Sequence, residues 1–284
     1  MSKIFSVSNQ KGGVGKTTTA VNLASICAAG NLKTLLIDSD PQGNSTSGFG
    51  IDRTNLKSTT YNVILRSNLI RESIIGTNID NLFLLPANSD LAASEIELIE
   101  LEEREFILRK QVLEIQDEFD VILIDCPPSL GLLTINALVA SDQLIIPLQC
   151  EYYALEGLGQ LLNTFKLVQE KLNPGLEIGG VLLTMADFRT NLTQQVIEEV
   201  RKYFGEKTFE TVIPRSVKIS EAPSFGKPVV LYDPSSKGGI AYQLAGAEFI
   251  KKFNLTCGAK IEEGKKPSED NVESTKETEQ VSGV

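Results

Sequence analysis

The chain has 284 residues, of which 42% are hydrophobic and 23% charged, and its formal net charge at pH 7 is −10. That length suits one large domain with a substantial core, and because no apolar run reaches the roughly 18 residues of a membrane span and no signal-peptide pattern precedes the first strand, we expect a cytoplasmic protein. The sequence has no histidine, which excludes Ser-His and Cys-His catalysis, and its four cysteines form no C-x-x-C pair, which argues against a zinc site or a disulfide framework.

Short apolar runs rich in β-branched residues alternate along the chain with amphipathic stretches, which predict buried strands and helices respectively. In chain order these are strand 3–8, helix 16–29, strand 33–37, strand 81–85, helix 89–115, strand 120–124, helix 130–139, strand 143–147, helix 155–172, strand 178–183, helix 192–204, strand 209–213 and helix 240–253. The alternation predicts an α/β fold with a mostly parallel, doubly wound sheet flanked by helices.

The composition changes near the end of the chain. Large apolar residues become rare after Cys257, where the sequence reads GAKIEEGKKPSEDNVESTKETEQVSGV. A segment of this kind cannot bury enough apolar surface to offset the entropy of ordering. We therefore expect one domain over residues 1–257, followed by a disordered acidic tail over 258–284.

The first predicted strand runs into the stretch NQKGGVGKTT, which places bare backbone directly before a helix. A strand, a glycine-rich turn and Gly-Lys-Thr at a helix start wrap backbone N–H groups around a phosphate, and the helix N-terminus adds its positive end. Lys16 then reaches the β- and γ-phosphates, and the Thr17 hydroxyl binds Mg²⁺. The alternative is a glycine-rich turn followed by an ordinary surface lysine. The predicted nucleotide-binding residues of the loop itself are Gly12, Gly13, Val14, Gly15, Lys16, Thr17 and Thr18. They define a predicted P-loop NTPase.

The loop departs from the template G-x-x-x-x-G-K-[ST], because Gln10 stands five residues before Gly15 and a second lysine, Lys11, opens the loop. The form KGGVGKTT resembles the deviant Walker A motif of the ParA/MinD group of P-loop ATPases. The resemblance implies an ATP-dependent homodimer in which Lys11 crosses to the nucleotide of the other subunit, like an arginine finger. Without the resemblance, Lys11 is equally well interpreted as an exposed loop cation.

Two carboxylate motifs follow strands that should end near this loop. The segment TLLIDSDPQGN carries Asp38 and Asp40, and VILIDCPP ends its strand with Asp125. Both match motifs of the ParA family. The resemblance implies that Asp40 orients the attacking water, that Asp38 supports the metal and switch region, and that Asp125 holds Mg²⁺ in a Walker B strand. The alternative for Asp40 is a cap on the following turn. The adjacent Cys126 is more simply a packed thiol.

The resemblance extends over residues 2–253 to the short, chromosomal-type ParA proteins called Soj, through LQCEYYALEGL, TMADFRTNLTQQV and VIPRSVKISEAPSFGKPV. In that group the proline of the Pro-Arg dipeptide lies against adenine, which implies a stacking role for Pro214. A proline that merely ends a strand is an equal alternative. Larger relatives carry an N-terminal helix-turn-helix extension that has no counterpart here, so we do not expect sequence-specific operator binding.

The charges are unevenly distributed. Residues 72–120 contain thirteen acidic and three basic groups, whereas residues 189–252 contain ten basic and seven acidic groups. Within the basic third, Arg189 and Lys218 align with positions at which Soj-like proteins carry DNA-contacting arginines. The resemblance therefore implies sequence-independent, salt-sensitive binding of double-stranded DNA. Ordinary surface cations are the alternative for both residues.

Three functions follow from the superfamily. We favour an ATP-dependent switch for chromosome or plasmid segregation that is weak alone, is stimulated by a ParB-type centromere-binding protein and is nucleoid-associated when ATP-bound. A MinD-like, membrane-cycling regulator of division-site placement needs a C-terminal amphipathic helix with a basic face, and the tail has neither the apolar stripe nor the charge. An iron–sulfur or metallocluster reductase needs paired cysteines at a dimer seam, and only Cys126 lies near the predicted ATP site.

Overall fold

The computed structural model describes residues 2–151 and 154–257, so the predicted tail over 258–284 lies outside the described residues. Its centre is a seven-stranded sheet in the order β3-β4-β2-β5-β1-β6-β7, with every pairing parallel except that between β3 and β4. The strands are β1 (Lys3–Val7), β2 (Thr34–Asp38), β3 (Ile75–Gly76), β4 (Leu82–Leu85), β5 (Val121–Asp125), β6 (Gln143–Gln149) and β7 (Glu177–Thr184). The predicted doubly wound α/β fold is confirmed.

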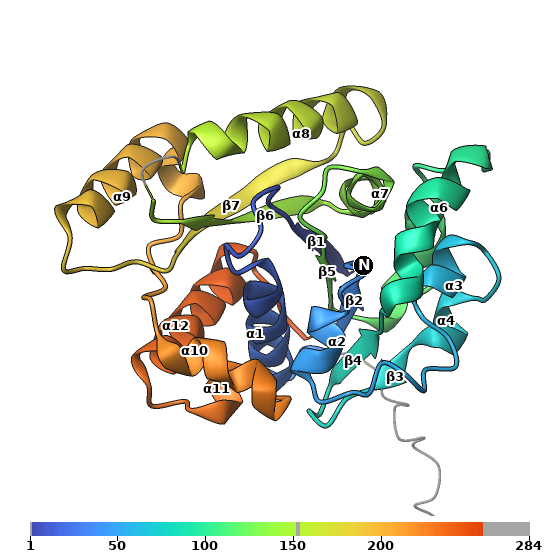
Figure 1. Cartoon of the computed structure of the whole chain (residues 1–284), viewed down its shortest axis with the longest axis horizontal. Coiled ribbons are helices and arrows are strands. Elements are labelled where there is room, and N and C mark those ends of the chain that lie inside the picture. The colour runs from blue at the N-terminus through green and yellow to red at the C-terminus, as the bar shows by residue number, and fades with distance from the viewer. Residues whose placement is uncertain (1, 152–153, 258–284) are drawn as a thin grey trace, which may run out of the picture.

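Helices cover both faces of the sheet (Figure 1). Their bounds are α1 (Lys16–Ala29), α2 (Asn44–Gly48), α3 (Thr60–Ile64), α4 (Ile70–Ser73), α5 (Ser94–Glu97), α6 (Ile107–Leu113), α7 (Leu132–Ala140), α8 (Gly159–Lys171), α9 (Asn191–Phe204), α10 (Val217–Glu221), α11 (Val229–Tyr232) and α12 (Lys237–Lys252). Helices α1, α11 and α12 pack on one face, and α3, α4, α6, α7, α8 and α9 on the other.

The central strands are apolar on both faces, as strands covered by helices must be. Along β5, Leu123 packs with α1 and α12, whereas Ile122 and Ile124 on either side of it pack with α6 and α7. Strand register then sets the position of the polar residues. Asp38 at the end of β2 pairs with Asp125 at the end of β5, and Val7 at the end of β1 pairs with the same aspartate. The phosphate loop and both carboxylates therefore emerge at one edge of the sheet.

The long helix predicted over 89–115 is broken. It is replaced by 3₁₀ turns, the single turn of α5 and the separate helix α6. Backbone angles leave the helical region at Leu101, and Glu103 adopts a positive φ of 54°. Asn136 of α7 explains the interruption, because its amide donates to the Arg104 carbonyl while its oxygen accepts from the N–H of Leu108. A tertiary contact has overridden the helical pattern.

The strand predicted over 209–213 was wrong. This segment runs beside β7 but makes only isolated bridges at its two ends, at Thr208 and Pro214. The N–H groups of Phe209 and Ile213 still donate to the β7 carbonyls of Val181 and Leu183, but between them the N–H groups of Glu210 and Thr211 donate to the Glu248 carboxylate of α12. Because those donors are already engaged, a continuous ladder cannot form.

Candidate functional site

The loop between β1 and α1 is shaped to hold an anion. Gly13 and Gly15 have φ values of 76° and 92°, a conformation that favours glycine, and no atom lies within 4 Å of the position where a Cβ would stand on Gly12 or Gly13. Gly15 precedes α1 and offers no side-chain cap, so the first N–H groups of this 14-residue helix point out unpaired. An anion at this helix end would satisfy them.

Polar contacts hold the loop from both sides. The Asn9 carboxamide donates to the Pro147 carbonyl at 2.8 Å and accepts from the N–H of Lys11 at 3.0 Å. On the far side, the Thr184 hydroxyl donates to the Val14 carbonyl at 2.8 Å. The sequence analysis missed Asn9 and Thr184. Their signal was a polar residue directly after β1 and another at the end of β7.

Lys16 is only 6% exposed, and its Nζ donates to the Lys11 carbonyl at 3.1 Å. Burial lowers the pKa of this ammonium group, while the nearby carboxylates of Asp125 and Asp40 oppose that shift. A buried cation held mainly by a backbone oxygen has unused donors. It is therefore prepared to receive a phosphate oxygen.

Two fully buried carboxyl groups stand next to each other at the ends of β2 and β5. Asp38 accepts from the Thr46 N–H and hydroxyl at 2.8 and 2.7 Å and from the Asp40 N–H at 3.2 Å. Burial raises the pKa of Asp38, and the hydrogen bonds from Thr46 oppose the rise. Asp38 thus holds the segment that follows β2 in place.

Asp125 has one satisfied and one unsatisfied oxygen. Ser45 donates to its Oδ2 at 2.8 Å, whereas its buried Oδ1 has no hydrogen-bond partner among the described residues. Burial, together with the charge of Asp38, raises the pKa of Asp125 strongly, and the hydroxyls of Ser45 and Thr17 act against the rise. An orphaned carboxylate oxygen in a carboxyl group close to a P-loop threonine fits a divalent cation, which would stabilise the ionised form.

A cleft of about 280 Å³ lies beside the loop. Asp40 reaches it, 6% exposed, with its Oδ1 accepting from the N–H of Gln42 at 2.9 Å. The cleft is lined by Gly12, Gly13, Gly15, Lys16, Thr17, Thr18, Asp40, Gln42, Asn44, Pro128 and Met185. The structure therefore brings most of the predicted phosphate-binding residues and the water-orienting Asp40 to one cavity, together with Thr17 of the three predicted metal residues. Gln42, Asn44 and Ser45 were missed, although the polar run QGNS after Asp40 signalled them.

A second, smaller cavity of about 70 Å³ adjoins the loop through Gly15 and Thr18, and Pro214 is part of its wall. The segment that carries Pro214 is fixed to β7, because the Ala186 N–H donates to the Ile213 carbonyl at 3.0 Å and the Arg215 N–H donates to the Ala186 carbonyl at 3.0 Å. Pro214 thus occupies a position suited to a flat base. Buried Tyr242 lines the same cavity.

Six predicted residues line neither cavity: Val14, Asp38 and Asp125 are buried in the loop and at the strand ends, whereas Lys11, Arg189 and Lys218 are at the surface. Lys11 is about half exposed, does not line the cleft, and forms an ion pair with Glu151. Arg189 is 88% exposed in its side chain and pairs with Asp187. Lys218 pairs with Glu221 at 2.9 Å, and its ammonium group lies 5.7 Å from the centre of the Tyr232 ring.

The fold and the site define a P-loop nucleotide-hydrolysing protein. A family model described as an AAA domain matches residues 2–178. The chain is 55% identical over 242 residues to the sporulation initiation inhibitor protein Soj of Bacillus subtilis (85% of this chain and 96% of that protein), and 52% identical over 250 residues to the chromosome partitioning protein ParA of Myxococcus xanthus (88% of each). The chain belongs to the ParA/Soj family of chromosome-partitioning ATPases.

Among solved structures, the chain is similar to a cobyrinic acid a,c-diamide synthase from Mycobacterium smegmatis with bound ATP analog and magnesium. The TM-score is 0.79 at 35% sequence identity, with 89% of this chain and 96% of that chain covered. The same architecture therefore holds a magnesium nucleotide in that protein.

Proposed function

We propose that the protein is an ATP-dependent dimeric switch that segregates a chromosome or plasmid. Two copies close on ATP and Mg²⁺, and the pair binds nonspecific double-stranded DNA through Arg189 and Lys218. Hydrolysis, stimulated by a ParB-type centromere-binding protein, then releases the DNA. The protein would be cytoplasmic, and nucleoid-associated when ATP-bound. One observation carries the proposal: Lys11 is the first residue of the glycine loop, but its side chain does not line the cleft of its own chain and pairs with Glu151 instead.

In the proposed complex the phosphates lie along the glycine loop and over the N-terminus of α1, where unpaired N–H groups point out. Lys16 turns from the Lys11 carbonyl to the β- and γ-phosphates. Pro214 contacts the adenine. These contacts bind and orient the substrate without any covalent chemistry.

Thr17 and Asp125 would hold Mg²⁺, since Oδ1 of Asp125 has no hydrogen-bond partner among the described residues and the Thr17 hydroxyl is near enough to lower the pKa of this carboxyl group. When bound, the metal neutralises charge on the β- and γ-phosphate oxygens. Asp38 supports this site indirectly, because its oxygens accept from Thr46 and Asp40 and so fix the segment between them.

For hydrolysis, a water oxygen attacks the γ-phosphorus in line while the bond to the β–γ bridging oxygen breaks. Asp40 accepts a hydrogen bond from that water and so orients it. Lys16 and the Lys11 of the second copy stabilise the charge that develops on the phosphate oxygens. Because Lys11 has to arrive from outside, an isolated copy should be a weak ATPase.

Retention on DNA tests the proposal. Co-sedimentation with random duplex DNA should occur with ATP and Mg²⁺, but not with ADP or without nucleotide. Retention in all three conditions, or in none, would overturn the switch. A MinD-like protein would instead co-sediment with lipid vesicles in ATP. Among residues 2–151 and 154–257, no helix has both the length and the apolar character of a membrane span.

A further inference from the structure

The segment that carries α5 exposes apolar and acidic side chains together. Ile96 is 74% exposed and Ile99 is 58% exposed, while Leu98 between them is fully buried and anchors the segment to the core. The surrounding glutamates are also exposed. We refer to this surface as the α5 patch, made of Ile96, Glu97, Ile99, Glu100, Glu102 and Glu103. Exposure alone does not distinguish these side chains, since Val217 is 71% exposed elsewhere in the chain, but neighbouring apolar side chains rimmed by charged ones are typical of contact surfaces.

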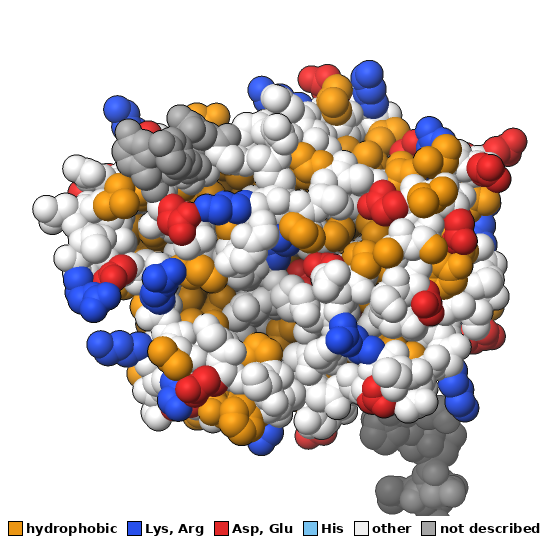
Figure 2. All heavy atoms as spheres, in the orientation of Figure 1, with side chains coloured by type: hydrophobic (Ala, Val, Ile, Leu, Met, Phe, Trp, Pro, Cys, Tyr) orange, Lys and Arg blue, Asp and Glu red, His pale blue; other side chains and the backbone are white. Residues whose placement is uncertain are grey.

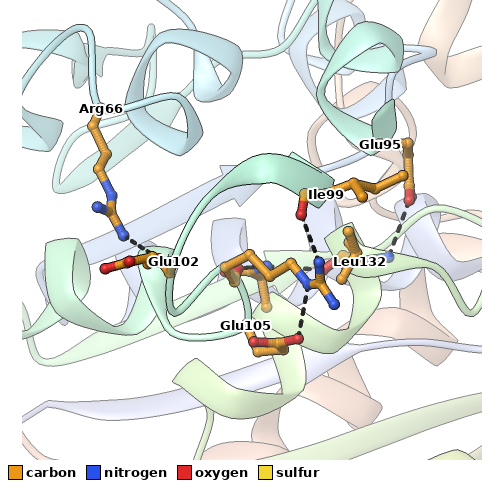
Figure 3. Close-up of polar contacts among 8 residues, drawn as sticks. Arg66, Glu95, Ile99, Glu102, Glu105 and Leu132 are labelled. Atoms are coloured by element: carbon orange, nitrogen blue, oxygen red, sulfur yellow. Dashed lines mark hydrogen bonds and ion pairs between the residues drawn. The ribbon is translucent and has the colours of Figure 1, made fainter. Parts of the chain in front are cut away.

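The α5 patch is negative and only partly neutralised. Residues 94–105 contain six glutamates and one arginine. That arginine, Arg104, is engaged by Glu105 and by the Ile99 carbonyl, and Arg66 donates to the main-chain oxygen of Glu102 and not to its carboxylate (Figure 3). Lys110 pairs with Glu103. Within the described chain, the carboxylates of Glu100 and Glu102 have no hydrogen bond or ion pair.

One side chain of the same segment, Glu95, contacts the start of α7 and the loop before it. Glu95 accepts at its Oε2 from the N–H of Leu132, the first residue of α7, at 3.0 Å (Figure 3). Its carboxylate lies so close to Gly131 that a Cβ there would stand 2.6 Å from Oε1. The loop that ends at Gly131 starts after β5 and includes Pro128, which lines the cleft. Glu95 therefore joins the α5 patch to a wall of the cleft.

We propose that the α5 patch is the docking surface for a basic amphipathic peptide segment of a protein partner, and that Glu95 transmits docking to the loop 126–131. The inference rests on the proposed function, since it names the surface through which a stimulating partner acts. Lysines and arginines of the peptide pair with Glu100 and Glu102, and its apolar side chains cover Ile96 and Ile99.

Charge decides among the possible occupants. DNA and anionic membranes carry the same sign as the α5 patch and are repelled by it. The chain's own segment 258–284 carries seven acidic and four basic residues, so it is not complementary either. A basic peptide combines the charge and the apolar surface that the α5 patch needs.

Binding can be measured with a fluorescein-labelled peptide of about 20 residues, with leucine and lysine at helical spacing. Anisotropy should show binding to the full chain that weakens on going from about 0.05 M to 0.3 M salt. The double variants Glu100→Gln/Glu102→Gln and Ile96→Ser/Ile99→Ser should each bind roughly tenfold more weakly. The matched control, Glu198→Gln/Glu199→Gln on the exposed face of α9, should bind like the wild type.

Equal binding of the peptide to the patch variants and to the α9 control would overturn the docking surface, as would a wild type that does not bind. A loss of ATP-dependent dimerisation in the patch variants, seen by size-exclusion chromatography, would also overturn it, since the surface would then belong to a second copy. ATP-dependent DNA retention of the same variants should be unchanged. Failure of retention in the wild type would count against the proposed function and leave the peptide result standing.

Transmission through Glu95 has its own test. Hydrogen exchange at residues 126–132 should slow on peptide binding in the wild type and in Glu95→Gln, whose amide oxygen can still accept from Leu132. The peptide should bind Glu95→Ala as tightly as it binds the wild type, but hydrogen exchange at residues 126–132 should then stay the same with and without peptide. A change in Glu95→Ala as large as in the wild type would overturn the positioning role of Glu95.

Discussion

Asp38 and Asp125 are two buried carboxyl groups whose pKa is raised in the folded chain. Both are fully buried at adjacent strand ends, and burial raises the pKa of each; the charge of Asp38 raises the pKa of Asp125 further, and that of Asp40 raises the pKa of Asp38. A group whose pKa is higher in the folded than in the unfolded chain destabilises the fold once it is ionised. The site therefore lowers stability in the absence of a cation, and a bound Mg²⁺ would restore it.

Replacing Asp125 by Asn should make the ligand-free protein more stable. The amide cannot ionise, so it removes the cost of burying this carboxyl group at a pH above its unfolded pKa, and its nitrogen can stand where Oδ1 has no partner. We expect the free energy of unfolding to rise by about 1–3 kcal/mol near neutral pH. The gain should shrink as the pH falls toward about 4, where the wild-type carboxyl group is protonated in both states.

Urea unfolding at several pH values would measure this gain. Ser45→Ala serves as the comparison, because it removes a donor to Asp125 and should lower stability instead. In the presence of ATP and Mg²⁺ the order should reverse, since Asp125→Asn cannot gain stability from the metal. A loss of stability in Asp125→Asn that is the same at every pH would contradict this interpretation.

Lys11→Ala should leave ATP binding nearly intact and reduce turnover by about 10²–10³-fold, the usual effect of removing one donor to transition-state charge. The side chain lies outside its own cleft, so its loss should not disturb the bound nucleotide. Fluorescent-nucleotide binding and phosphate release would measure the two effects.

Mixing variants tests whether Lys11 acts between copies. Asp40→Ala alone should also be inactive, because it cannot orient the water. In a mixed pair, the intact Asp40 of the Lys11→Ala copy meets the intact Lys11 of the Asp40→Ala copy, so one of the two sites is complete. Turnover should then reappear on mixing, and a mixture as inactive as its parts would exclude a role in trans.

The pairing of α1 with α12 fixes the direction of the helix that carries the phosphate loop. Gly246 of α12 lies against Ile26 of α1, and a Cβ there would stand 2.5–2.9 Å from three side-chain atoms of the isoleucine. Gly246→Leu should therefore lower the free energy of unfolding by about 1–3 kcal/mol. Ala247→Leu, which adds a leucine at the exposed neighbouring position, should change it little. Thermal and urea unfolding would measure both changes. An equal loss of stability in Gly246→Leu and Ala247→Leu would contradict the close contact between α1 and α12.

Elements with strong local signals could be predicted from the sequence, and those set by distant contacts could not. The buried strands around Leu36 and Leu123, and the loop that opens α1, carry their own patterns of apolar and glycine residues. The break in the helix predicted over 89–115 depends on Asn136, and the missing strand at 209–213 depends on Glu248, both far away in the chain. Short helices such as α10 depend on packing and give little periodic signal.

The same division holds for the site. Lys16, Asp40 and Asp125 follow from motifs, because glycine spacing and strand ends fix where they lie. Glu151, the partner of Lys11, stands 140 positions further along the chain and had no local signal. The counter-charges of Arg189 and Lys218 were missed although Asp187 and Glu221 are only two and three residues away, because charge spacing does not show which side chains turn toward each other.

At the scale of the molecule, basic side chains are more frequent toward α9, α10 and α11 than toward α6 and α3 (Figure 2). The proposed DNA binding by a chain of net charge −10 would depend on this asymmetry. Arg189→Glu should weaken binding to all duplex sequences alike and reduce the slope of log K against log salt by about one per copy or more. Lys166→Glu on the exposed face of α8 makes the same charge change as a control.

Asp187→Asn should act in the opposite direction and strengthen DNA binding, because it frees the Arg189 guanidinium from its internal partner. Anisotropy titrations over a range of salt would measure both variants. Loss of affinity restricted to particular sequences, or equal loss in Lys166→Glu, would show that Arg189 makes no specific contact with phosphates.

The ion pair between Lys11 and Glu151 has a kinetic consequence. While a copy is solitary, the side chain that would complete hydrolysis is held by a neighbour in its own chain. In the proposed pairing, activity per molecule should climb with protein abundance and fade on dilution. A high local concentration of copies at one place in the cell would then start ATP hydrolysis, and so set the lifetime of the ATP-bound pair, whereas dispersed copies would keep their ATP.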